Sequence, residues 1–154
     1  MKKLNLVVLL LSFASVFGQE TINVNKNGFA ADGYDVVAYF DNTPIEGQEK
    51  YKTEIDGVKY QFSSEENLQK FKENPEKYIP QYGGWCAYAI SLKNQKVEVN
   101  PKTFEIADGK LYLFYNAWGT NTLKLWQKEG AEKLRVQADK NWEKTKAVGY
   151  QEIP

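Results

Sequence analysis

The stretch YKTEIDGVKYQF, residues 51–62, decides how the first half of the chain folds. Its centre, Asp56-Gly57, is a strong signal for a two-residue hairpin because both positions of a type I′ turn need positive φ. The register set by this turn runs through to Tyr51 opposite Phe62. In that register one face is apolar and the other carries charges of opposite sign. Turn and pattern therefore predict the same antiparallel hairpin over residues 51–62.

A second hairpin is predicted over residues 103–115, because the pattern Asp-Gly-x-x-Tyr-x-Phe of residues 56–62 returns at residues 108–114. Here Leu111 and Leu113 share one face, and Tyr112 and Phe114 share the other. Large apolar side chains on both faces indicate a hairpin that is covered on both sides and central to the fold. The tyrosine and phenylalanine fall on different faces in the two copies, so we do not interpret them as a duplication.

Helices are predicted after each hairpin. Ser63 and Glu66 are typical of a capping box, and the helix that they start should end before Asn74-Pro75. Two C-terminal helices are predicted over about 120–129, with Asn121 as N-cap, and over 131–147. The fold class is therefore α+β, a small single domain in which two β-hairpins pack with short helices.

The first 18 residues are typical of a secretory signal peptide. Two lysines precede the apolar run of residues 6–17, which is too short for a bilayer span of roughly 20 residues. We expect cleavage after Gly18, which leaves residues 19–154 as a single domain. The expected location is the periplasm or the outside of the cell, with no membrane span after cleavage.

Composition excludes many kinds of chemistry. The 154 residues contain 20 Lys+Arg, 20 Asp+Glu, no His and one Cys. Without histidine there is no Ser-His-Asp or Cys-His catalysis and no His-bearing zinc site. The single Cys86 excludes an internal disulfide and every multi-cysteine metal cluster. An even charge balance supplies no basic field for nucleic acid. We therefore expect no nucleic-acid partner, no metal, no cofactor and a monomer, and we leave open whether the protein is an enzyme.

Three motifs taken together resemble the exported YHS-domain proteins of bacteria. They are GYDVVAYF at residues 33–40, YQFSSEEN at residues 60–67 and PQYGGWCAYA at residues 80–89. The resemblance covers roughly residues 28–145 and implies a small mixed fold and export. Other YHS domains are associated with metal handling through cysteines just after the Tyr-x-Phe strand. In this sequence Ser63 and Asn67 hold those places, so the metal site is not expected here.

The resemblance also directs attention to Cys86. Some exported relatives resemble this chain but carry selenocysteine at the matching position, which implies redox or nucleophilic chemistry. Gly83 and Gly84 permit close backbone approach, and a short helix predicted over residues 87–92 would place Cys86 in its first turn, where amides favour a thiolate. With no second cysteine in the chain, such chemistry needs an external thiol or small-molecule partner.

Two alternatives to this thiol-based redox role stay open. In the first, the protein is a non-enzymatic module that binds a small ligand, a metal complex or a partner, and Cys86 is structural. In the second, the domain is purely structural and has no pocket at Cys86. A sulfur that solvent reaches at the floor of a cleft favours redox chemistry or binding, whereas a buried sulfur in apolar packing favours a structural role.

Tyrosines and one carboxylate complete the candidate pocket. Tyr60, Tyr82 and Tyr88 would line it beside the cysteine, with their hydroxyls as polar contacts for a ligand. A short helix over residues 33–40 would place Asp35 and Tyr39 on one face, next to Tyr34. The alternative is that the tyrosines pack in the core and that Asp35 caps a backbone amide.

Overall fold

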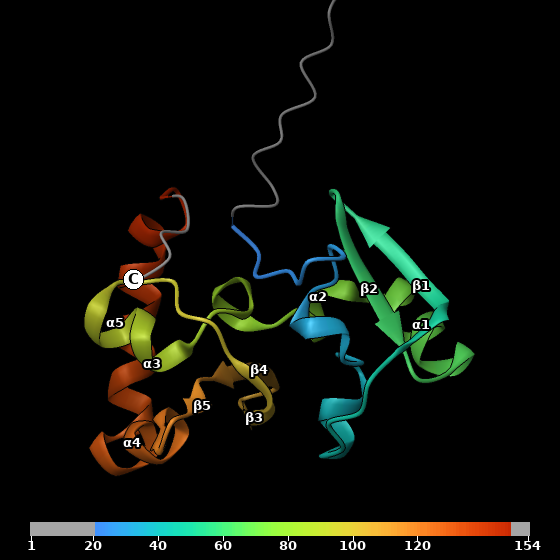
Figure 1. The fold of residues 1–154 in the computed structure, drawn as a ribbon. Coiled ribbons are helices and arrows are strands. Elements are labelled where there is room, and N and C mark those ends of the chain that lie inside the picture. The colour runs from blue at the N-terminus through green and yellow to red at the C-terminus, as the bar shows by residue number, and fades with distance from the viewer. Residues whose placement is uncertain (1–20, 149–154) are drawn as a thin grey trace, which may run out of the picture.

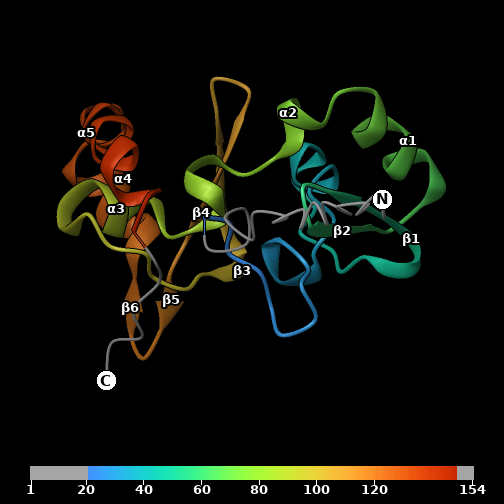
Figure 2. The same cartoon turned by 90° about the horizontal axis from the view of Figure 1, so that it is seen from above.

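The computed structural model describes residues 21–148 (Figure 1). Over these residues the chain forms short helices and three two-stranded antiparallel sheets, which confirms the predicted α+β class. The first hairpin and α1 lie at one end of the molecule, α3, α4 and α5 lie at the other end, and the second hairpin lies between them (Figures 1 and 2). The predicted signal peptide lies outside the described residues.

The first hairpin consists of β1 (Gln48–Ile55) and β2 (Val58–Phe62). Residues 52–55 pair with residues 58–61 in the predicted register, but the predicted pair of Tyr51 and Phe62 is wrong, because Phe62 pairs with Gln48. The side-chain amide of Gln48 also donates to the Ser63 carbonyl at 2.9 Å. Pairing is thus fixed at both ends of β1, and residues 49–51 form a bulge between them.

The second hairpin consists of β3 (Asn100–Ala107) and β4 (Lys110–Phe114). It begins three residues earlier than predicted, and β4 ends at Phe114. Leu111 and Leu113 pack in a first core with residues between 30 and 78. Tyr112 and Phe114 pack in a second core with residues of the C-terminal helices. The prediction that both faces are covered is confirmed, and β4 joins the two cores.

Helix α1 (Glu65–Glu73) leads into α2 (Pro75–Tyr78) at Asn74, as the Asn-Pro signal predicts. The predicted N-cap is wrong by one residue, because Ser64, not Ser63, accepts the backbone N–H of Asn67. Ser63 is instead bound to Asp35. Two 3-10 turns, Ala31–Gly33 and Ala38–Asp41, precede the first hairpin.

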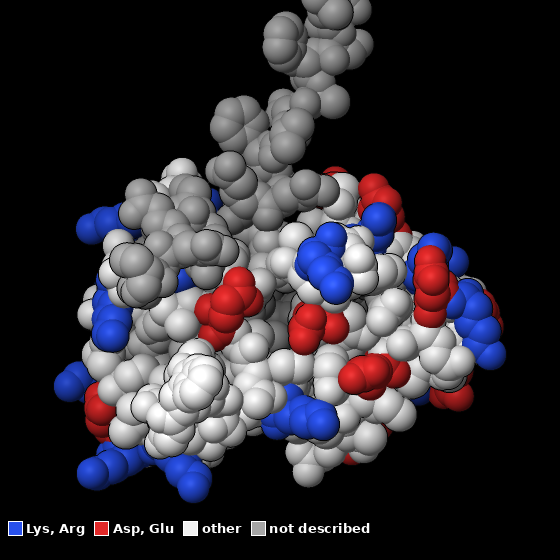
Figure 3. Space-filling model, viewed as in Figure 1, with Lys and Arg blue, Asp and Glu red and all other residues white. Residues whose placement is uncertain are grey.

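The C-terminal part starts with a 3-10 turn at Gln81–Gly84 and helix α3 (Ala87–Lys93). After the second hairpin, a small hairpin of β5 (Asn116–Ala117) and β6 (Thr120–Asn121) leads into α4 (Thr122–Glu129). Asn121 caps α4 as predicted. Helix α5 (Ala131–Thr145) ends two residues before the predicted boundary. Lysines, arginine and acidic residues are interspersed over the face shown in Figure 3.

Candidate functional site

Cys86 is the N-cap residue of α3, and its side chain has no exposed surface. The backbone N–H of Tyr115 lies 3.4 Å from Sγ and donates to it. Sγ also lies 3.3 Å from the hydroxyl of Thr122, which itself donates to the Tyr115 carbonyl at 2.9 Å. A threonine hydroxyl has one proton, and that proton is used on the carbonyl. With its proton directed there, the Thr122 oxygen can accept a hydrogen bond from the thiol.

The redox hypothesis requires the first amides of α3 to donate to the sulfur of Cys86, and they do not. Its own N–H donates to the Val97 carbonyl at 3.0 Å, and its side chain caps none of the free amides of α3. A thiolate gains its stability from such amides or from a cation. The described contacts of Cys86 are thus those of a fully buried side chain.

Gly83 and Gly84 pack against residues 21–23 and form hydrogen bonds with Asn23. The carbonyl of Gly83 accepts the backbone N–H of Asn23 at 2.8 Å, and the carbonyl of Gly84 accepts its side-chain amide at 3.3 Å. A Cβ on Gly83 would lie 2.2 Å from the Thr21 carbonyl oxygen, and the residue has φ of 61°. Both features require glycine. Its function in the structure is close packing of this segment rather than support of a thiolate.

Asp35 is fully buried and lies in a closed hydrogen-bond network. One carboxylate oxygen accepts the N–H groups of Val37 and Ala38, at 2.9 and 3.2 Å. The other accepts the amide and hydroxyl of Ser63, at 2.8 and 2.6 Å, and the side-chain amide of Asn67 at 2.7 Å. Ser63 and Asn67 thus anchor a buried carboxylate.

This network also replaces the helix predicted over residues 33–40. That prediction is wrong, because Tyr34 is extended and the 3-10 turn begins only at Ala38. The carboxylate of Asp35 caps the start of this turn, which is the alternative that the sequence left open. The Tyr39 hydroxyl donates to the Pro101 carbonyl at 2.6 Å, and burial raises the pKa of Tyr39 well above its usual range.

The other candidate tyrosines fall in different parts of the molecule. Tyr34 and Tyr60 belong to the first core, and burial raises the pKa of Tyr60 to about 12. Tyr82 and Tyr88 lie in or against the second core. The Tyr88 hydroxyl donates to Glu129 at 2.7 Å, and partial desolvation together with that carboxylate raises its pKa to about 12. The structure therefore does not bring the predicted residues together in one pocket around Cys86.

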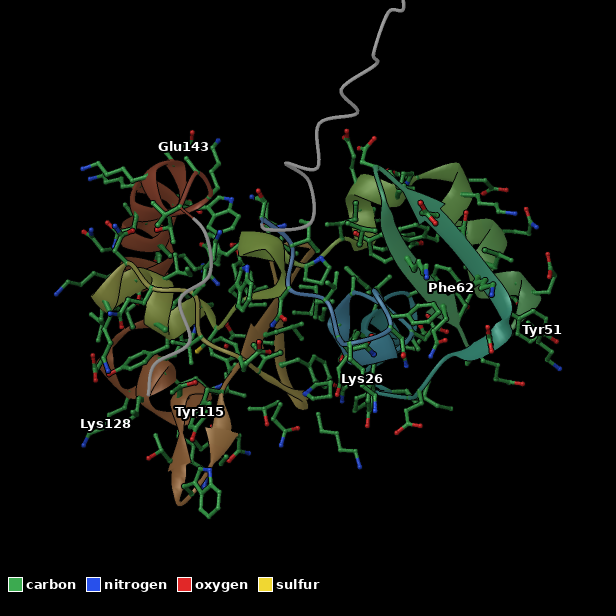
Figure 4. The ribbon with its side chains drawn as sticks, turned by 45° about the horizontal axis from the view of Figure 1, so that its top comes forward. Lys26, Tyr51, Phe62, Tyr115, Lys128 and Glu143 are labelled. Carbon is green, nitrogen blue, oxygen red and sulfur yellow. The ribbon has the colours of Figure 1, made fainter. Side chains whose placement is uncertain are left out.

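A cleft of about 540 Å³ does open beside Tyr82, between α2 and α5. Tyr82 and Trp142 supply aromatic surface, with their ring centroids 6.2 Å apart. Ile79 and Pro80 add apolar surface next to them. The charged residues of the lining are Glu76, Lys110, Asp139 and Glu143, the last of which is labelled on α5 in Figure 4.

Tyr82 connects the cleft to the second core. Its ring is buried and its hydroxyl donates to the Asp139 carboxylate at 2.9 Å. Burial, followed by that hydrogen bond, raises the pKa of Tyr82 well above its usual range, so the phenol stays protonated. The backbone of Tyr82 is left-handed, with φ of 53°, which is a strained conformation for a bulky residue. Strain of this kind concentrates at functional sites.

The sequence singled out Tyr82 but missed most of this cleft. Glu76, Asp139 and Trp142 come from segments about 60 residues apart in the chain, and their approach depends on how α5 packs. In the sequence, Asp139 and Trp142 lie three residues apart on the predicted C-terminal helix, which places them near each other but not beside Tyr82. The cleft can offer flat apolar contact together with an excess of negative charge.

Comparison with known families identifies a YHS domain at residues 36–82. Comparison with curated proteins and with solved structures gives no match. The matched region starts directly after Asp35, includes the first hairpin, α1 and α2, and ends at Tyr82. It therefore contributes most of the first core, whereas Cys86 and the C-terminal helices lie beyond it.

Two further features of residues 21–148 bear on the kind of site. Among these residues, no helix is both long and apolar enough to span a bilayer. Nor do they contain a group of three or more His, Cys, Asp or Glu side chains arranged to hold a metal ion. The carboxylates of the cleft are thus dispersed around its lining.

Proposed function

We propose that the protein is an exported, non-enzymatic binding module whose YHS domain and C-terminal helices form a cleft for a small ligand. In this proposal Cys86 is structural. The observation that carries it is the cleft between α2 and α5, where buried Tyr82 and half-buried Trp142 meet three carboxylates. Pockets that combine aromatic walls with a few polar groups are typical of ligand sites.

The lining favours a ligand that has a flat apolar body and a positive charge. Asp139 and Glu143 lie one turn apart on α5, and Glu76 lines the cleft from α2. Lys110 offsets only one of these three negative charges. An ammonium group near Trp142 would also gain a cation–π contact, of about 0.5–1 kcal/mol at an exposed site. Glu143 is paired with Lys146 at the surface, whereas Asp139 accepts a hydrogen bond from the neutral Tyr82 hydroxyl, which leaves its negative charge in place.

The binding test uses phenethylamine as the cationic probe and phenylacetate as its anionic counterpart. We expect phenethylamine to shift the NMR signal of the Trp142 indole N–H and phenylacetate to leave it unchanged. Asp139→Asn with Glu143→Gln should weaken phenethylamine binding about tenfold, equivalent to about 1.4 kcal/mol. Glu132→Gln, which removes an exposed charge from α5 outside the cleft, is the matched control. Equal binding of both probes, or of neither, would contradict the proposal.

The structural role of Cys86 is tested by alkylation. We expect iodoacetamide to modify the thiol only after the protein unfolds in urea, because the sulfur has no exposed surface. Rapid modification of the folded protein, with a thiol pKa well below the ordinary value of about 8.5, would instead support the redox hypothesis.

Export is tested on the protein recovered from cells. Support comes from the sequence, in which two lysines precede a short apolar run and small residues precede the expected cut. We expect the periplasmic or secreted protein to start at Gln19 when its intact mass is measured. Full-length protein that is retained in the cytosol would contradict this part of the proposal.

A further inference from the structure

The hairpin β5–β6 carries Trp118 at its tip, and this side chain is 96% exposed. Figure 2 shows the hairpin projecting from the body of the molecule beyond the end of β4. Isolated exposed apolar residues are normal on a protein surface. A tryptophan with almost its whole side chain in water is unusual, because burial of its large aromatic ring would lower the free energy considerably.

The backbone of Trp118 makes its exposure more unusual. Trp118 and Gly119 have φ of 53° and 77°, as both central residues of a type I′ turn require. The other two hairpins of this chain place Asp56 and Asp108 at the same turn position. A bulky residue there costs about 1–2 kcal/mol, and no packing offsets this cost. Broken local rules of this kind are expected where a residue has a function.

Hydrogen bonds anchor the base of the hairpin that carries Trp118. The side-chain amide of Asn116 donates to the Thr103 hydroxyl at 3.0 Å. The backbone carbonyl of Asn116 accepts a hydrogen bond from the side-chain amide of Asn100 at 3.3 Å. At the base, the Tyr115 carbonyl accepts both the amide and the hydroxyl of Thr122. Tyr115 is labelled at this base in Figure 4. Such anchoring lowers the entropy lost when the tip binds.

A groove that suits this tip runs between α3 and α5 of the same chain. It has a volume of about 960 Å³ and is lined by Leu92 and Val136, which are 51% and 53% exposed. Lys93 and Lys133 also line it. The third charged residue of the lining, Glu129, already accepts a hydrogen bond from Tyr88. The groove therefore offers apolar contact beside two ammonium groups.

We propose that Trp118 of one copy inserts into the α3–α5 groove of a second copy of the chain. The indole would cover Leu92 and Val136, and the lysine ammonium groups would lie against its π-face, which prefers cations. Residues 115–121 carry no charge, so docking brings no charged group of the tip into the groove. Projection and groove are different surfaces, so the contact is heterologous and forms rings or open chains.

This self-association is independent of the ligand cleft and is tested by sedimentation over about a hundredfold range of concentration. We expect the average mass of the wild-type protein to rise with concentration. Trp118→Ala, which removes the projection, and Val136→Asp, which blocks the groove, should each remain monomeric. Ile45→Ser changes an exposed apolar residue in the first half of the chain and should associate like wild type.

Mixing the two monomeric variants provides the decisive experiment. Trp118→Ala retains a groove and Val136→Asp retains a projection, so an equimolar mixture should form a one-to-one dimer that neither variant forms alone. Urea midpoints equal to that of the wild type would show that all variants are folded. The proposal is overturned if the wild type stays monomeric, if Trp118→Ala still associates, or if the mixture stays monomeric.

Discussion

The two large hairpins share the pattern Asp-Gly-x-x-Tyr-x-Phe, and the structure allows a direct comparison of what that pattern does in each. The turn is the same in both. Asp56 and Asp108 each have φ of 51°, and Gly57 and Gly109 have φ of 79° and 71°. In both hairpins the residues that flank the turn pair directly with each other. The pattern therefore fixes the turn and the register close to it.

The surroundings of the two hairpins differ. In β2 only alternate residues are buried, and Lys59 is exposed between Val58 and Tyr60. In β4 the four residues after Lys110 are all buried. The difference lies in the three variable positions of the pattern, which are Val, Lys and Gln in the first copy and Lys, Leu and Leu in the second. One pattern thus gives a hairpin at the end of the molecule in one case and a central strand in the other.

The residue after each phenylalanine reveals a second parallel. The N–H of Ser63 donates to a buried carboxylate oxygen of Asp35 at 2.8 Å, and the N–H of Tyr115 donates to the buried sulfur of Cys86 at 3.4 Å. In both cases a distant segment supplies the acceptor. A carboxylate is a much stronger acceptor than a thiol, so the two anchors should differ in strength.

Removing the stronger anchor should have the largest effect. Asp35→Ala leaves five donor groups of four residues without their buried acceptor, and we expect the free energy of unfolding to fall by about 3–5 kcal/mol. Urea denaturation followed by circular dichroism measures this. Asp35→Asn keeps one acceptor oxygen and should lose less. A loss below about 1 kcal/mol for Asp35→Ala would show that the network does not hold the first hairpin in place.

The variable positions of the pattern give the next largest effect. Leu111 is fully buried and the equivalent residue in the first copy, Lys59, is exposed. We expect Leu111→Ala to lower the free energy of unfolding by about 2–5 kcal/mol and Lys59→Ala by less than about 0.5 kcal/mol. The same urea experiment compares the two variants. Similar losses for both variants would contradict the difference in burial between β2 and β4.

The weaker anchor should give a smaller loss. Cys86→Ala removes one small buried side chain and leaves the Tyr115 amide without an acceptor, at a cost of about 1–2 kcal/mol. Cys86→Ser restores the same hydrogen bonds in a smaller side chain and should lose less than Cys86→Ala. The midpoint temperatures of thermal unfolding of the wild type, Cys86→Ala and Cys86→Ser give the order of their stabilities. If Cys86→Ser is the less stable variant, apolar packing of the sulfur outweighs its hydrogen bonds.

The shared turn predicts two small and equal effects. Gly57 and Gly109 have open space where a Cβ would lie, so only the positive φ opposes a side chain. We expect Gly57→Ala and Gly109→Ala each to lower the free energy of unfolding by about 1 kcal/mol. Urea midpoints measured in parallel would test this equality. A difference larger than the loss itself would show that the strands, and not only the turn, set the cost.

What the sequence predicted correctly depends on contacts between near neighbours. The Asp-Gly turns, the cap at Asn121 and the two faces of β4 follow from residues a few positions apart. The bulge at residues 49–51 and the use of Ser63 by Asp35 depend on contacts across the fold, which a local pattern does not contain. The cleft beside Tyr82 was missed for the same reason, since α2 and α5 are far apart in the chain.

The last comparison concerns the pKa of the central tyrosine of the pattern, which is Tyr60 in the first copy and Tyr112 in the second. It has no effect on stability at neutral pH. Burial raises the pKa of Tyr60 to about 12 and also raises that of Tyr112, against an ordinary value of about 10. Well below pH 10 both tyrosines are neutral in the folded and unfolded states, so they do not change the stability there. As the pH rises from 10 towards 12, the unfolded chain ionises first and is favoured.

We therefore expect the urea midpoint to fall over this range and to fall less steeply in Tyr60→Phe and Tyr112→Phe. The part of the tyrosinate absorbance that each Phe variant lacks relative to the wild type should appear together with unfolding and not before it. A midpoint that falls equally in the wild type and in both variants would assign the alkaline loss to other groups. If only Tyr60→Phe flattens the curve, the first copy of the pattern excludes water from its phenol more completely than the second copy does, in line with the larger rise in the pKa of Tyr60.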